Sequence, residues 1–84
     1  MESNDRSDHP RIAVDPEIML GKPTIRGTRL TVELILEEIA CGATVADLLE
    51  DYPRLTQSDV QAALQYAASR LHEEAERRRE RVAF

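Results

Sequence analysis

The chain has 84 residues, of which 42% are hydrophobic, and it carries a formal net charge of −5. This length suffices for one small domain and leaves little room for a second domain or a large active-site cavity. The chain contains one cysteine, three aromatic residues and no apolar run near the ~18 residues of a membrane span, so we expect a cytoplasmic protein without a disulfide or a membrane anchor.

The first predicted elements are a solvated tail and a short strand. Residues 1–10 are mostly polar and lack the apolar core of a signal peptide, which is typical of a disordered tail. Residues 11–14 favour a strand, and Asp15-Pro16 favours a turn after it. Residues 17–20 are apolar but long enough only for a single helical turn before Gly21.

Residues 24–30 predict a tight hairpin. Gly27 can adopt the positive φ that the first central position of a type II′ turn requires, so the predicted loop is residues 26–29. In this register Arg26 lies opposite Arg29, and Ile25 lies opposite Leu30. Like charges that face each other across two strands cost a few tenths of a kcal/mol to about 1 kcal/mol.

The charge of this hairpin makes it the first candidate site. Two interpretations of the arginine pair remain open. Either water screens an exposed pair, or the hairpin binds an anion, which is a phosphate or a carboxylate of a partner protein. The candidate residues are Lys22, Arg26, Gly27 and Arg29.

Three helices are predicted to follow, with Thr31, Thr44 and Thr56 as their N-caps. Asp47 and Asp59 stand three residues after the second and third caps, where they complete capping boxes. Gly42 and Pro53 predict the ends of the first two helices. The expected apolar faces are Val32, Ile35, Leu36 and Ile39; then Val45, Leu48, Leu49 and Tyr52; then Val60, Leu64, Ala67 and Leu71.

Beyond Leu71 the apolar pattern fades into a charged extension. Residues 72–81 are mostly acidic and basic, with Glu–Arg pairs spaced i,i+4, and they predict a helix that projects past the core and frays. Val82 and Phe84 at the end are interpreted as part of a disordered terminus or, alternatively, as an anchor for a partner.

The residue pattern supports neither catalysis nor metal binding. His9 and His72 lie far apart, Cys41 has no companion, and no serine has a histidine placed to activate it. The Gly21-Lys22 pair lacks the glycine and hydroxyl spacing of a phosphate-binding loop. We therefore expect no metal and no cofactor, and we expect that the protein is not an enzyme.

The second and third helices resemble a helix-turn-helix pair braced by the first helix. Uncharged hydrogen-bonding groups then lie on the third helix, away from its apolar stripe, where they could read base edges: Gln57, Ser58, Gln61 and Gln65. Against this, Asp59 repels phosphate and no Lys or Arg occurs between Gln57 and Ser69. A solvated face of a structural helix is the competing interpretation.

Several apolar side chains lie off the predicted stripes, and exposed apolar patches usually mark an interface. We therefore expect a homodimer, which would bring two copies of the cationic hairpin into one assembly. The residues are Ile18, Met19, Leu20 and Leu34.

Together these elements predict a mainly α fold, with a homeodomain-like three-helix core that contains a helix-turn-helix and a short N-terminal β-hairpin. The predicted boundaries are a tail at 1–10, a single domain at 11–71 (hairpin 11–30, trihelical core 31–71) and a helical or frayed extension at 72–84. The charge imbalance lies in residues 31–71, with seven acids against Arg54 and Arg70.

Residues 11–71 resemble the family called domain of unknown function 433. The resemblance is carried by Asp15-Pro16, Gly21-Lys22-Pro23, residues 25–29, Val32, Gly42, Tyr52-Pro53, Leu55-Thr56, Asp59-Val60, Ala63-Leu64 and Tyr66-Ala67. It implies a small prokaryotic protein with a trihelical core, often encoded beside a PIN-type nuclease-like protein and regarded as antitoxin-like.

With this resemblance, our first hypothesis is a non-enzymatic, antitoxin-like protein that neutralises a PIN-like ribonuclease toxin, and operator DNA is an additional expected partner of its dimer. The alternative function is that of a stand-alone helix-turn-helix transcription regulator.

Overall fold

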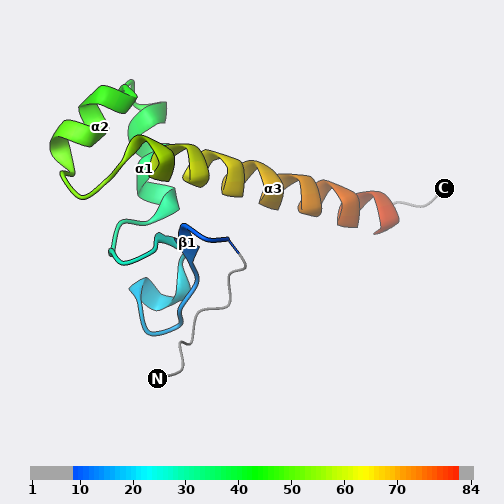
Figure 1. Ribbon diagram of the computed structural model, residues 1–84. Coiled ribbons are helices and arrows are strands. Elements are labelled where there is room, and N and C mark those ends of the chain that lie inside the picture. The colour runs from blue at the N-terminus through cyan, green and yellow to red at the C-terminus, as the bar shows by residue number, and fades with distance from the viewer. Residues whose placement is uncertain (1–8, 82–84) are drawn as a thin grey trace.

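The computed structural model describes residues 9–81, and it is mainly helical with a short antiparallel sheet near the N-terminus, as predicted (Figure 1). The predictions for residues 1–8 and for Val82 and Phe84 lie outside the described residues. The elements are β1 (Ile12–Ala13), a 3₁₀ turn η1 (Met19–Gly21), β2 (Thr24–Ile25), α1 (Val32–Ala40), α2 (Val45–Asp51) and α3 (Gln57–Arg81).

The two strands are short because turns follow both of them. Ile12 pairs with Ile25 and Ala13 pairs with Thr24, and all four residues are buried. An isolated bridge between Thr24 and Thr31 continues the sheet to the start of α1. This bridge has the predicted hairpin register, in which Ile25 faces Leu30, and the Ile25 N–H donates to the Leu30 carbonyl at 2.8 Å.

The tip of this hairpin differs from the predicted type II′ turn. The turn spans residues 25–28, because the Thr28 N–H donates to the Ile25 carbonyl at 3.0 Å. Gly27, with φ of +83°, is therefore the second central residue rather than the first. The Thr28 hydroxyl donates to the Ile25 carbonyl and accepts from the Leu30 N–H, so it replaces the expected pairing of Arg26 with Arg29.

The connection between the strands contains a left-handed turn where a single helical turn was predicted. Met19, Leu20 and Gly21 have φ of +50°, +59° and +83°. Backbone hydrogen bonds from Gly21 to Ile18 and from Lys22 to Met19 close this turn. Its non-glycine residues adopt a conformation that costs ~1–2 kcal/mol each, and Leu20 remains 94% exposed.

All three helices begin at the predicted threonines. The Thr31 hydroxyl accepts from the Leu34 N–H, and Thr44 and Thr56 each exchange two hydrogen bonds with Asp47 and Asp59 respectively. At the end of α1, Gly42 adopts φ of +106°, and the N–H groups of residues 42 and 43 bond back to the last turn. These local hydrogen bonds fix the helix boundaries.

The core lies where the first part of α3 packs against α1, α2 and β1. Its buried side chains are Ile12, Ile25, Val32, Ile35, Leu48, Leu55, Val60, Ala62 and Ala63. The predicted stripe on α3 is wrong at Leu64 and Leu71, which are 42% and 66% exposed. On α2, Val45 of the predicted apolar face is also exposed. The reason on α3 is that its alanines face the core, where small side chains permit close approach of α1 and β1.

Helix α3 extends well beyond the body of the molecule. Its C-terminal half projects away from α1, α2 and the strands (Figure 1). Most side chains of residues 68–79 are exposed. None of the helices in residues 9–81 combines the length and the apolar character that crossing a bilayer requires.

Candidate interaction site

The cationic hairpin does not present Arg26 to an outside ligand. Arg26 donates from Nε to the Pro10 carbonyl at 3.0 Å, and from Nη2 to the carbonyls of His9 and Ile12 at 2.8 Å each. The displaced turn makes this possible, because it directs the guanidinium back across β1. Arg26 therefore fastens the segment before β1 to the sheet.

Lys22 is also engaged within the molecule. Its Nζ lies 2.9 Å from Glu33 Oε1 at the start of α1, with both side chains more than half exposed. The hydrogen bond to Glu33 raises the pKa of Lys22 above its ordinary value. An exposed ion pair of this kind contributes ~0–1 kcal/mol, and it offsets much of the positive charge that Lys22 would offer.

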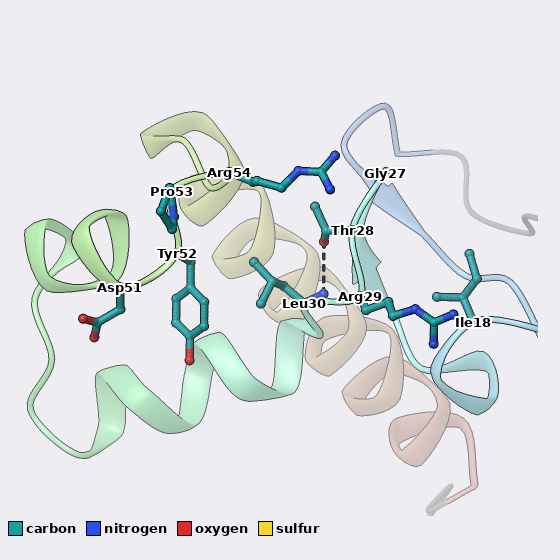
Figure 2. A pocket seen from close by; sticks show the side chains of 9 residues that line it. All are labelled: Ile18, Gly27, Thr28, Arg29, Leu30, Asp51, Tyr52, Pro53 and Arg54. Carbon is teal, nitrogen blue, oxygen red and sulfur yellow. Dashed lines mark hydrogen bonds between the residues drawn. The ribbon is translucent and has the colours of Figure 1, made fainter.

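Arg29 lies in a different setting, at a pocket of about 730 Å³ between the hairpin tip and the connection from α2 to α3. The two halves of this pocket come from segments far apart in the sequence (Figure 2). The lining residues are Ile18, Gly27, Thr28, Arg29, Leu30, Asp51, Tyr52, Pro53 and Arg54.

The pocket combines an apolar lining with two guanidinium groups and one carboxylate, that of Asp51. Ile18, Leu30 and Pro53 supply apolar surface, and Arg29 and Arg54 are exposed. Among residues 9–81 neither arginine has an ion-pair or hydrogen-bond partner. A planar guanidinium binds carboxylate or phosphate with two parallel hydrogen bonds. The pocket can therefore hold an anionic group that is attached to an apolar one.

Tyr52 is fixed at one wall of this pocket. Its hydroxyl donates to Glu38 Oε2 on α1 at 2.5 Å, and this hydrogen bond raises the pKa of Tyr52 above its ordinary value. The bond ties the end of α2 to α1 and holds the ring in place. A wall that is ordered before binding lowers the entropic cost of taking up a ligand.

Sequence reasoning identified two of the nine lining residues as site residues, Gly27 and Arg29, and missed Arg54. A signal for Arg54 existed, because it is one of only two basic residues in the acidic segment 31–71 and lies in a short turn between helices. Nothing in the local pattern showed that this turn meets the hairpin tip.

The second predicted site, on α3, is exposed. Gln57, Ser58, Gln61 and Gln65 all lie at the surface. Asp59 lies among them in sequence but is nearly buried, with its carboxylate 3.1 Å from Arg11 Nη1. Sequence reasoning missed this ion pair, which joins α3 to the residue before β1.

The described residues hold no cluster suited to a metal. Within residues 9–81, no three or more His, Cys, Asp or Glu side chains converge on a common point where an ion could be bound. Cys41 is an exposed free thiol at the end of α1.

Comparison with known proteins gives the same family from sequence and from structure. The family model described as "Protein of unknown function (DUF433)" matches residues 12–67. The chain is 34% identical over 56 residues to the uncharacterized protein y4eO of Sinorhizobium fredii, covering 67% of this chain and 25% of that protein. It thus spans about a quarter of the length of that relative.

A solved structure agrees with this assignment. A DUF433 member protein from Anabaena variabilis superimposes with a TM-score of 0.71 at 30% identity, covering 80% of this chain and 66% of that one.

Proposed function

This chain belongs to the DUF433 family, and we propose that it is a non-enzymatic, antitoxin-like protein that binds and neutralises a PIN-like ribonuclease toxin. Both the non-enzymatic character and the toxin partner are part of this proposal. The single observation that supports it best is the pocket between the hairpin tip and the α2–α3 connection, whose two arginines have no ion-pair or hydrogen-bond partner within residues 9–81.

The chemistry of the pocket defines what the partner must supply. An apolar lining beside two guanidinium groups suits a protein segment in which a carboxylate follows or precedes an apolar side chain. Buried aromatic and arginine contacts of this type often dominate the free energy of protein association. The net charge of −5 further suits a partner whose own surface attracts polyanionic RNA.

The experiment is a co-purification of the full chain with the product of the adjacent reading frame. The double variant Arg29→Ala, Arg54→Ala should lose the partner or weaken binding at least tenfold in titration calorimetry. The control is Arg77→Ala, which removes an exposed arginine on the projecting part of α3. Unchanged binding by the double variant would contradict the role of the pocket, and failure of the unmodified chain to bind would contradict the toxin partner.

The exposed glutamines of α3 favour a second candidate function, DNA binding by a helix-turn-helix pair. Gln57, Ser58, Gln61 and Gln65 face solvent at the N-terminal end of the helix that would read bases. Fluorescence anisotropy with the protein's own upstream DNA tests this function. Gln61→Ala should reduce the preference for that DNA over a scrambled duplex, and equal affinity for both duplexes would argue against operator recognition.

A further inference from the structure

An apolar row runs along the exposed side of α3. Leu64 and Leu71 are 42% and 66% exposed, and Ala68 and Ala75 are exposed as well. Their spacing of four, three and four residues places all of them on one face of the helix, as in a coiled-coil seam. In the part of the chain that the structure describes, this face is open to solvent.

The order of side-chain sizes in this row is complementary to itself. Along the chain the row reads Leu, Ala, Leu, Ala. When a second copy lies antiparallel, Leu64 of one copy faces Ala75 of the other, and Ala68 faces Leu71. Every large side chain then meets a small one, which is the arrangement that fills a helix interface without voids. A two-fold axis repeats each contact.

The charges of α3 are compatible with the antiparallel direction that the side-chain sizes select. From residue 57 to residue 69 the helix has one charged side chain, Asp59, which is paired with Arg11. All other charges lie from residue 70 onward. A parallel pair would place the charged half of each helix along the charged half of the other. An antiparallel pair instead places the charged half of each helix beside the uncharged half of the other, so like charges are kept apart.

We propose that two copies of this chain pair through α3 in an antiparallel arrangement, with Leu64, Ala68, Leu71 and Ala75 as the seam. This surface differs from residues 18–20 and Leu34, from which the sequence predicts a dimer. Gln61 lies on the same face as the seam, one turn before Leu64, where the second copy's C-terminal half passes. The dimer therefore covers Gln61, and self-association and base reading through Gln61 exclude one another.

The first test is the oligomeric state of the full chain by sedimentation velocity. Four seam residues per copy make a small interface, so we expect a dissociation constant on the order of tens of micromolar. Leu71→Glu should weaken the dimer at least tenfold. Ser69→Glu, which adds the same charge at an exposed position on another face, should leave the constant unchanged. Circular dichroism verifies that both variants remain folded, as expected for exposed positions.

The second test is the register, measured by disulfide formation in a Cys41→Ser background. Ala68→Cys mixed with Leu71→Cys should cross-link faster than either variant alone, because identical residues are offset by about 4.5 Å along the helix axis in this register. The proposal is overturned if the chain is a monomer at about 500 μM or if Leu71→Glu and Ser69→Glu change the dissociation constant equally. It is also overturned if either cysteine variant alone cross-links faster than the mixture. Binding of a toxin is not required for either measurement.

Discussion

Replacing Arg26 by alanine should destabilise the fold, although the side chain lies at the surface. Its guanidinium donates three hydrogen bonds to the carbonyls of His9, Pro10 and Ile12, at 2.8–3.0 Å. These bonds join the segment before β1 to the turn after β2. In the variant, all three carbonyls lose this donor. Water can replace it at the exposed carbonyls of His9 and Pro10 more readily than at the partly buried carbonyl of Ile12.

The magnitude follows from the exposure of these bonds. A hydrogen bond to a charged group contributes ~1.5–3 kcal/mol to stability, and a typical hydrogen bond contributes ~0.5–1.5 kcal/mol. Because two of the three bonds are exposed, we expect a total loss of about 1–2 kcal/mol. This loss corresponds to a fall in melting temperature of roughly 4–8 °C for each kcal/mol in a domain of this size. Arg26→Lys should recover only part of it, since an ammonium lacks the planar fork.

The assay is urea unfolding followed by circular dichroism, with Arg29→Ala as the matched control. Arg29 belongs to the same hairpin tip but has no ion-pair or hydrogen-bond partner within residues 9–81, so its removal should change the free energy of unfolding by less than about 0.5 kcal/mol. If the two variants are equally stable, the hydrogen bonds from Arg26 to the segment before β1 contribute nothing and the reasoning fails.

Two further predictions concern single groups. The backbone hydrogen bond from Thr44 lowers the pKa of Asp47 in the folded state. The ionised Asp47 therefore stabilises the fold above the pKa that it has in the unfolded chain, and this stabilisation is lost as the pH falls through the lower folded pKa. The denaturant midpoint should drop below about pH 4, and it should drop less in Asp47→Asn. Gly27→Ala should lower the free energy of unfolding by about 1–2 kcal/mol through φ of +83° alone, since a Cβ there meets no atom within 4 Å, and an unchanged thermal midpoint would contradict this.

Local signals predicted the helices well. Thr31, Thr44 and Thr56 mark helix starts because their hydroxyls satisfy N–H groups only three residues away, and Gly42 marks an end for a similar reason. The hairpin register followed from Ile25 and Leu30 in the same way. Contacts between residues that are close in the sequence can be predicted from the spacing of residue types along the chain.

Longer-range contacts were not predictable in this way. The turn type depends on the Thr28 hydroxyl and on a reach from Arg26 back to His9, which no periodic pattern reveals. The orientation of α3 depends on Ala62 and Ala63 facing the core while Leu64 faces outward. The pocket forms only where three separate segments meet, so Arg54 could be recognised as unusual but not as part of a site.

At position 20, in the left-handed turn at Met19–Gly21, selection for ease of folding and selection for binding favour different residues. Glycine at position 20 would relieve backbone strain, and the leucine there is almost wholly solvated, so the folded state gains little from keeping it. Across many relatives, a large aliphatic residue retained at this position would reveal selection for contact with another molecule. Glycine there would reveal selection for ease of folding alone.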